Sequence, residues 1–324
     1  MSEPAAGGSV PAGRARVLVV GGSGFVGRYV VAQLSAAGHF VVVLTRRRAR
    51  VRHLLLLPTV QVVEGDPHDD ATLARHVRGM TAAVNLAGVL HERGRDTFAR
   101  VHVELPRRLA AACRNAGVSR LLHMSALRAS ADAPSRYLRS KAEGEAAVVA
   151  SGVAWTAFRP SVMFGREDTF LNLFASLARW SPVLPLAAAN ARFQPVYVAD
   201  VATCFVRTLG DNETIREAYD LCGPAVYTLE ELVRYVCEVS GRQRPIIRLG
   251  PALSSFQARV MEWLPWPLMT RDNLASMQVD NVCDAGFPAR FGVVPAALEA
   301  IAPGYLAPSA QHSRFDAFRA HGGR

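Results

Sequence analysis

The sequence predicts an α/β protein built on a doubly wound parallel sheet, with a smaller, discontinuous C-terminal domain. Two observations lead to this prediction. Short apolar runs alternate with amphipathic segments through the first half of the chain, and 324 residues are more than one hydrophobic core usually holds. Half of the residues are hydrophobic, which is enough for an extensive core. Strands joined by helical crossovers pair in parallel, so this order of segments favours a β–α repeat.

The apolar runs are expected to be buried strands, because a parallel sheet is covered on both faces. They span residues 17–20, 41–44, 60–63, 82–86, 121–124 and 155–158. Helical spacing of apolar residues predicts crossover helices over 28–37, 71–78 and 103–116, the last ending at Gly117.

A glycine-rich turn directly follows the first predicted strand. Its glycines have the spacing GxxGxxG and lead into a helix. Glycine lets the backbone approach a pyrophosphate, and the helix N-terminus adds free amides and a positive dipole end. This strand–turn–helix context is typical of a Rossmann-type dinucleotide site. The expected cofactor-binding residues of the turn are Gly21, Ser23, Gly24, Phe25, Val26 and Gly27.

The second half of the chain has a different pattern. Helical periodicity mixed with Pro and Trp covers 170–186 and 251–269, whereas 193–206 and 218–221 resemble late strands that return to the sheet. We therefore expect a discontinuous second domain. The predicted division is a disordered tail over 1–14, an NAD(P)-binding Rossmann domain over 15–165 plus 191–225, a substrate or partner domain over 166–190 plus 226–310, and a tail over 311–324.

The end of the second predicted strand bears on the choice of cofactor. NAD-binding proteins place an acid there to accept from the ribose 2′-hydroxyl, but here Thr45 is followed by Arg46 and Arg47. A guanidinium pairs well with a 2′-phosphate. The alternative is a solvated basic loop, since not all of the arginines between 46 and 52 can contact one phosphate. The pattern favours NADP over NAD.

Tyr137 and Lys141 are the candidate acid/base pair. Their i, i+4 spacing places both side chains on one face of a helix, where an ammonium is expected to lower the pKa of the phenol. Ser125, at the end of a predicted strand, is positioned to polarise the same substrate oxygen. Tyr and Lys four residues apart also occur by chance on exposed helices, so the pair alone does not establish catalysis.

These features resemble the extended and atypical branch of the short-chain dehydrogenase/reductase superfamily, which includes NAD-dependent epimerases and dehydratases. The resemblance runs from Arg16 to about Leu306, and further matching segments lie in the same order at 66–69, 85–88, 159–165, 198–202 and 222–224. Within that branch the chain looks most similar to bacterial relatives of the nucleotide-binding accessory subunit of respiratory complex I, through 123–126, 137–144, 164–165 and 193–197.

The resemblance implies a role for each matching position. Tyr137 would be the general acid/base, and Lys141 would both tune it and bind the nicotinamide ribose. Asp66 with Pro67 would meet the adenine, Leu86, Ala87 and Gly88 would line the ribose side, and Pro160 to Val162 would lie along the nicotinamide. Ser125 departs from the pattern, because it stands only twelve residues before Tyr137 and many extended members place this residue further upstream.

Several other polar residues have structural interpretations. Asp200 is expected to cap a helix that begins near Val201, although an acid between apolar residues also suits catalysis. His91, His102 and His123 are expected in loops or the core, and no metal is assigned because nothing at metal-ligand spacing accompanies them. The five cysteines lie far apart, which predicts neither a zinc site nor a disulfide framework and fits a reducing, cytoplasmic compartment.

Charge and hydropathy restrict the possible partners. The formal net charge is +10, but the arginines are spread along the chain without a nucleic-acid-binding motif, so no nucleic-acid partner is expected. No run reaches the roughly 18–20 apolar residues of a membrane span, and no signal peptide is expected at the start. Segment 251–269 carries an apolar stripe that suits a protein partner, peripheral contact with the inner face of a membrane, or burial over the substrate pocket.

Two functions remain open on the sequence. The first is an NADP-dependent oxidoreductase or epimerase that acts on a carbonyl or alcohol of unknown identity, with Tyr137 moving the proton. The second is a catalytically silent nucleotide-binding protein that assembles with a partner, as the likeness to the complex I subunit implies.

Overall fold

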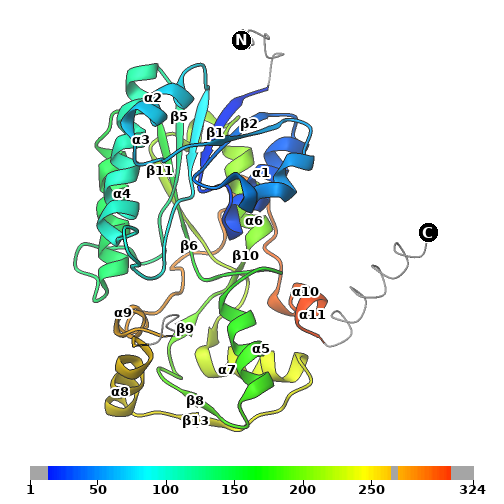
Figure 1. Ribbon diagram of the computed structural model, residues 1–324. Helices are drawn as coiled ribbons and strands as arrows, with labels where there is room; N and C mark the ends of the chain where they lie inside the picture. The colour runs from blue at the N-terminus through cyan, green and yellow to red at the C-terminus, as the bar shows by residue number, and fades with distance from the viewer. Residues whose placement is uncertain (1–13, 264–268, 308–324) are drawn as a thin grey trace.

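The computed structural model describes residues 14–263 and 269–307. Its largest element is a seven-stranded sheet in which every pairing is parallel. The strands are β1 (Arg16–Val20), β2 (Phe40–Thr45), β3 (Val60–Glu64), β4 (Ala82–Asn85), β5 (Arg120–Met124), β6 (Trp155–Pro160) and β11 (Glu217–Leu221). Their order is β11-β6-β5-β4-β1-β2-β3, so the chain winds outward in both directions from β1 and β4 (Figure 1). The predicted Rossmann-type fold and its six strands are confirmed.

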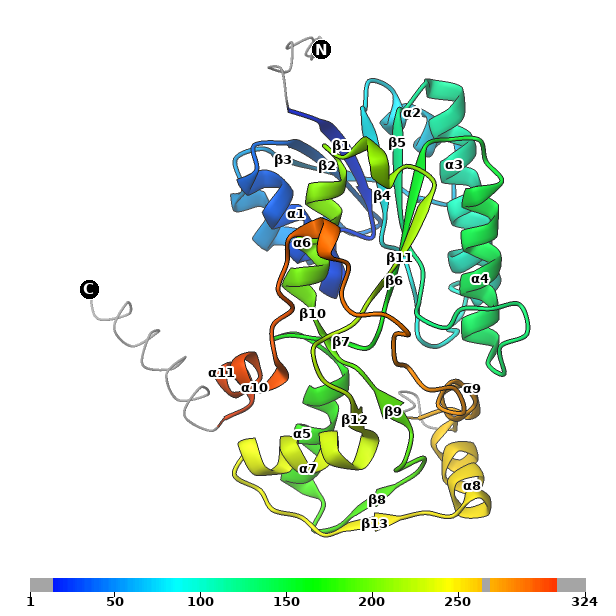
Figure 2. The same cartoon turned by 180° about the vertical axis from the view of Figure 1, so that it is seen from behind.

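Helices cover both faces of the sheet, which explains why its strands are continuously apolar. One face packs against α1 (Phe25–Ala36) and α6 (Val198–Thr208), and the other against α2 (Asp70–Val77), α3 (Leu105–Ala116) and α4 (Arg136–Val149) (Figure 2). Along β1, Val17 and Val19 belong to the first core cluster, whereas Leu18 and Val20 belong to the second. This alternation follows from the two-residue period of a strand.

The helix ends follow local chemistry. α2 begins where the Asp69 side chain accepts a hydrogen bond from Thr72 N, and α4 begins where Ser135 accepts one from Leu138 N. α3 ends at Gly117 with φ 69°, as predicted. The segment predicted as one helix over 103–116 instead opens with a π-helical turn, η2 (Ala99–Glu104), before α3. Pro106 lies at the start of α3, where its missing N–H costs nothing.

A second unit lies beyond the carboxyl ends of the sheet strands (Figure 1). Its hydrophobic cluster joins α5 (Phe170–Trp180), α7 (Leu229–Val239), α10 (Leu298–Ile301) and α11 (Pro303–Leu306). Three short pairs of strands complete it: β7 (Met163–Phe164) with β10 (Val196–Tyr197), β9 (Arg192–Phe193) with β12 (Tyr227–Thr228), and β8 (Leu184–Leu186) with β13 (Ile246–Arg248). Helices α8 (Pro251–Met261) and α9 (Arg271–Ser276) lie to one side, and η1 (Arg48–Leu56), η3 (Asn212–Thr214) and η4 (Ala289–Phe291) are short 3₁₀ segments.

Several predictions for the second half were wrong in detail. Residues 193–206 are mainly helix α6, because Val198, Val201, Ala202 and Phe205 recur at helical spacing and are all buried. Asp200 lies inside the first turn of that helix and does not cap it. Its Oδ2 instead accepts from Ala296 N at 2.8 Å, which ties a distant segment to α6. The strand predicted at 218–221 is confirmed as β11.

The expected helices over 170–186 and 251–269 are shorter than predicted. α5 ends at Trp180, and α8 ends at Met261. The tails over 1–13 and 308–324, and residues 264–268 with Trp266, lie outside the described residues. Among the helices that the structure describes, none has the length and apolar character needed to cross a membrane.

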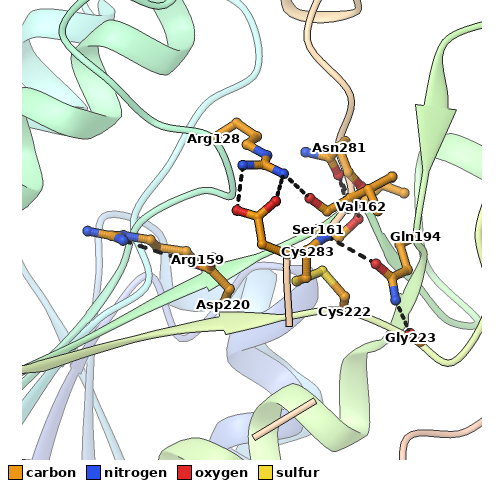
Figure 3. Close-up of a disulfide and its surroundings, with 12 residues drawn as sticks. Arg128, Arg159, Ser161, Val162, Gln194, Asp220, Cys222, Gly223, Asn281 and Cys283 are labelled. Atoms are coloured by element: carbon orange, nitrogen blue, oxygen red, sulfur yellow. Dashed lines mark hydrogen bonds and ion pairs between the residues drawn. A yellow bond between two sulfur atoms is a disulfide. The ribbon is translucent and has the colours of Figure 1, made fainter. Parts of the chain in front are cut away.

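The prediction that the cysteines form no disulfide was wrong for one pair. Cys222 and Cys283 are bonded, with their Cα atoms 6.1 Å apart, although 61 residues separate them in the sequence (Figure 3). Cys113, Cys204 and Cys237 are free and buried. Cys222 directly follows β11, and the fold brings the segment around Cys283 to the carboxyl end of this strand. No spacing rule reveals such a contact.

Candidate nucleotide and catalytic site

The glycine turn lies between β1 and α1, at the point where the strand order reverses. Gly21 has φ +83°, and a Cβ on it would lie 2.6 Å from Ala87 N. A Cβ on Gly27 would lie 2.4 Å from Gly21 O. The first position therefore permits contact with the turn after β4, and the last permits close packing of α1 on the turn.

The N-terminus of α1 is arranged as an anion site requires. Its N-cap is Gly24, so no cap side chain bonds to the amides of the first turn. Ser23 precedes the cap, and Phe25 and Val26 open the helix. The Phe25 ring reaches Gly165, where a Cβ would lie 3.4 Å from its edge. The turn is thus next to the first residues of the second unit.

The turn after β4 is shaped by Asn85. Its Oδ1 accepts from Ala87 N at 3.2 Å, and its Nδ2 lies 3.1 Å from His123 Nδ1. Leu86 N continues the sheet by donating to Val20 O. Of the predicted ribose-side residues, Leu86 and Ala87 therefore adjoin the glycine turn directly, whereas Gly88 faces Lys141 and His102.

A cluster of ionic contacts lies at the expected adenosine end. The Arg46 guanidinium pairs with both oxygens of Asp96, at 2.7 and 2.9 Å. Asp66 is exposed, accepts from His68 N across Pro67, and lies 3.5 Å from Arg100 Nη2. Arg47 is exposed beside Arg46, and its backbone N donates to Thr45 Oγ1. Asp96 and Arg100 were not predicted, because neither stands at a recognisable spacing from the second strand.

Tyr137 and Lys141 share one face of α4, as predicted. Lys141 is 5% exposed, and its Nζ donates to Met124 O at 3.1 Å, at the end of β5. A Cβ on Gly88 would lie 3.4 Å from the same Nζ. Burial lowers the pKa of Lys141 to about 8, while Glu145 opposes the shift. Lys141 therefore links the turn after β4 to α4 and to the end of β5.

The expectation that Lys141 lowers the tyrosine pKa was wrong. Burial raises the pKa of Tyr137 to about 12. The Lys141 ammonium is directed to Met124 O, and the Tyr137 ring packs edge-on against Phe98 and His102. Tyr137 is consequently a neutral phenol at neutral pH, which is the form that donates a proton.

Ser125 lies immediately after β5 and is 2% exposed. Its backbone N donates to Phe158 O at 2.8 Å, which extends the pairing with β6. Its Oγ has no hydrogen-bond partner among the residues that the structure describes. A buried hydroxyl without a partner is uncommon and suits a group that binds a ligand.

His102 joins the parts of this site, and the sequence did not indicate that role. Val89 N donates to His102 Nε2 at 3.0 Å, so the ring proton must be on Nδ1, which lies 2.8 Å from Ser140 Oγ. Ser140 donates in turn to Tyr137 O at 2.7 Å. The chain of hydrogen bonds holds the turn after β4 against α4. Both His102 and His123 are buried, as expected, whereas His91 is half-buried.

The predicted nicotinamide side is the end of β6. Pro160 O accepts from Leu127 N, and Val162 N donates to Asn281 Oδ1 at 2.9 Å. The structure thus places the glycine turn, the 86–88 turn, Lys141, Ser125 and Tyr137 around the carboxyl ends of β1, β4 and β5. Within the described ranges no cluster of three or more His, Cys, Asp or Glu side chains has the arrangement of a metal site.

Comparison with known proteins gives consistent results. A family model described as NAD(P)H-binding matches residues 21–173. Subunit 9 of the mitochondrial NADH dehydrogenase [ubiquinone] 1 alpha subcomplex from Mus musculus is 34% identical over 290 residues, which cover 87% of this chain and 77% of that protein. Ceramide reductase from Caulobacter vibrioides is 34% identical over 77% of this chain and 78% of its own length.

A solved structure shares the fold. The dTDP-glucose 4,6-dehydratase DesIV from Streptomyces venezuelae, determined with NAD bound, superposes with a TM-score of 0.64. It is 25% identical, and the match covers 72% of this chain and 84% of that one. The relatives therefore include both an NADH dehydrogenase [ubiquinone] subunit and a reductase, and the fold is shared with a dTDP-glucose 4,6-dehydratase.

Proposed function

We propose that this chain is an NADP(H)-dependent oxidoreductase that acts on a carbonyl or alcohol. The chain belongs to the NAD(P)-binding, short-chain dehydrogenase/reductase-like family that includes NADH dehydrogenase [ubiquinone] 1 alpha subcomplex subunit 9. The observation that carries the proposal is the convergence at the end of β5. The Lys141 ammonium and the Ser125 hydroxyl, which has no hydrogen-bond partner among the described residues, lie at the end of β5. The Tyr137 phenol comes from the same face of α4 as Lys141, and Lys141 Nζ lies beside Gly88. An inert nucleotide cradle needs neither the Ser125 hydroxyl nor the Tyr137 phenol.

The residues suit proton transfer in the direction of reduction. Tyr137 is protonated at neutral pH and can donate to a carbonyl oxygen as it becomes an alkoxide. Ser125 Oγ can donate a hydrogen bond to the same oxygen, and Lys141 lies next to Gly88 to hold the ribose. The bound nicotinamide would supply or accept the hydride.

The preference for NADP rests on Arg46. No acid ends β2, and a guanidinium stands there instead. The pair with Asp96 means that a 2′-phosphate has to displace or share that carboxylate. Arg46 therefore supports NADP binding, and Asp96 opposes it.

The test is turnover of NADPH against a panel of carbonyl and quinone substrates, in the wild type and in Tyr137→Phe. The variant removes only the phenol oxygen, so turnover should fall about 10²–10⁴-fold while nucleotide affinity stays nearly constant. Lys141→Ala should reduce both. Tyr235→Phe is the matched control, because it removes a phenol oxygen that has no hydrogen-bond partner among the described residues and lies on α7, in the second unit. Equal rates in wild type and Tyr137→Phe, or no turnover in either, would exclude this function.

A second candidate is a nucleotide-binding assembly protein for a respiratory or membrane-associated partner, which would act at the inner face of a membrane. The observation that favours it is the exposed apolar face of α8 and the turn after it, formed by Leu253, Phe256, Val260 and Trp263. Trp263 is 90% exposed, so the described part of this stripe is not ordinary core over a substrate pocket. The relatives that are complex I subunits support the same candidate.

A further inference from the structure

We propose that residues 280–284 form a strap that positions Ser161 and Val162 on the nicotinamide side of the site, with Asn281 as the positioning residue and the Cys222–Cys283 disulfide as its redox-sensitive fastening. The inference rests on the proposed placement of Pro160 and Val162 along the nicotinamide. It adds residues more than a hundred positions downstream that no feature of the sequence connects with the cofactor.

Asn281 controls the backbone directly after β6. Its Oδ1 accepts from Val162 N at 2.9 Å and from the Ser161 hydroxyl at 2.6 Å. Ser161 is 3% exposed, and its own N donates to Leu221 O, so this residue is fixed between β11 and the strap. One side-chain oxygen therefore satisfies two consecutive residues at the predicted nicotinamide edge (Figure 3).

The backbone of the strap is fixed to the second unit. Asn281 N donates to Arg192 O at 2.8 Å, and Gln194 N donates to Asn281 O at 3.0 Å. The Gln194 side chain adds two bonds: its Oε1 accepts from Cys283 N, and its Nε2 donates to Gly223 O. Gln194 thus bridges the two segments that carry the bonded cysteines.

Arg128 holds the end of the strap from the opposite side. Its guanidinium pairs with both oxygens of Asp284, at 3.0 and 2.7 Å, and donates to Val282 O at 2.7 Å. Arg128 has φ 60°, in the left-handed region that residues with a Cβ rarely adopt. The contacts with the strap stabilise this backbone, and Arg128 follows Ser125 by three residues. The strap therefore connects both sides of the candidate catalytic site.

The disulfide makes this arrangement sensitive to thiols. A dithiol reagent supplies two electrons and two protons and becomes a disulfide itself, while the Cys222–Cys283 bond breaks and leaves two thiols. Cys222 is fully buried and Cys283 only half-buried, so attack should occur at the Cys283 side. Reduction leaves the Asn281 bonds in place but frees the strap to move, and small displacements of positioning groups reduce binding.

The test compares binding of a whole cofactor with binding of a fragment that lacks nicotinamide. The nucleotide is whichever of NADPH and NADH the wild type binds more tightly, and the fragment is 2′-phospho-ADP-ribose or ADP-ribose, respectively. Asn281→Ala should weaken the whole cofactor about tenfold and leave the fragment within about twofold. Asn281→Asp keeps the acceptor oxygens and should restore most of the loss. Dithiol treatment and Cys283→Ser should shift affinity in the same direction by a smaller factor.

Asn172→Ala is the matched control, because Asn172 is also half-buried and hydrogen-bonded but lies on α5. Equal losses for cofactor and fragment, or no loss in Asn281→Ala, would overturn the role of the strap alone. A wild type that binds the fragment as tightly as the whole cofactor would instead remove the nicotinamide placement, and the strap proposal with it. The assay measures binding, so a catalytically silent protein still gives a decisive result.

Discussion

At the scale of single residues, the site depends on buried histidines that stay uncharged. Burial lowers the pKa of His102 to about 2 and that of His123 to about 3, and the nearby charge of Lys141 adds to both shifts. Protonation of His102 would also remove the acceptor that Val89 N requires. The neutral rings are therefore part of the folded structure.

Acid should destabilise the protein through these two residues. Their folded pKa values lie below the unfolded value of about 6.5, so the unfolded chain takes up protons first as pH falls. The contribution of these histidines to the free energy of unfolding is fully present above about pH 6.5. It decreases toward pH 3, by up to about 1.4 kcal/mol per pH unit for each histidine. Melting temperature between pH 4 and 8 measures this slope. His102→Gln should flatten it more than His53→Gln, which changes an exposed histidine; identical slopes would contradict the assignment.

Arg46 and Asp96 should determine cofactor choice in opposite directions. Arg46→Ala removes a charge-assisted pair with the 2′-phosphate, which should cost about 1.5–3 kcal/mol for NADPH and little for NADH. Asp96→Asn releases the guanidinium from its bidentate partner and should strengthen NADPH binding. Titration of both nucleotides checks this, with Arg271→Ala as the control because its pair with Glu262 lies near α8 and α9. Equal losses for the two nucleotides in Arg46→Ala would show that Arg46 does not meet the phosphate.

At the scale of elements, α4, which carries Tyr137 and Lys141, is held unusually close to η2. A Cβ on Gly144 would lie 1.8 Å from His102 O, so only glycine permits this approach of α4. The same contact keeps the His102 ring next to Ser140 and Tyr137. The packing of α4 against η2 therefore also determines how His102, Ser140 and Tyr137 lie relative to one another.

Gly144→Ala should destabilise the protein by about 1–3 kcal/mol, because the added methyl group meets backbone that cannot move aside without shifting η2. Urea unfolding measures the loss. Gly210→Ala is the control, since a Cβ there meets nothing within 4 Å and should change stability by no more than about 0.5 kcal/mol. A similar small effect for both variants would mean that α4 can retreat from η2 without cost.

At the scale of the whole molecule, the exposed apolar face of α8 and the turn after it is the feature that the enzyme proposal does not use. Leu253, Phe256, Val260 and Trp263 are each more than half exposed, and the chain carries a formal net charge of +10. Apolar side chains on a basic protein suit an anionic lipid surface or a protein partner.

Phe256→Ser combined with Trp263→Ser should reduce flotation with anionic liposomes, or recovery of a protein partner, without lowering the melting temperature. Both side chains are exposed, so their loss removes apolar contact area but little internal packing. Trp180→Ser is the control, because Trp180 is 79% exposed on α5. Equal association of the double variant, the control and the wild type would exclude α8 as the contact surface.

The sequence by itself determined the sheet, most of the crossover helices and the glycine turn. These features depend on local rules. Parallel strands buried on both faces are continuously apolar, and helices repeat their apolar residues with a period of 3.6 residues. Only glycine fits at position 21, where a Cβ would meet Ala87. The i, i+4 spacing of Tyr137 and Lys141 likewise predicted that both side chains lie on the same face of α4. It did not predict the pKa of Tyr137, because that value follows from burial.

Only the tertiary structure decided which distant residues complete the site. Arg46 meets Asp96 across 50 positions, Cys222 meets Cys283 across 61, and Val162 meets Asn281 across 119. No periodicity links such pairs, since their contact depends on how crossovers and the second unit close around the sheet. The same closure decides which polar groups lose water, and hence the neutral state of His102 and the lowered pKa of Lys141. The spacing of residues along the sequence predicts neither which of these groups are buried nor their pKa values.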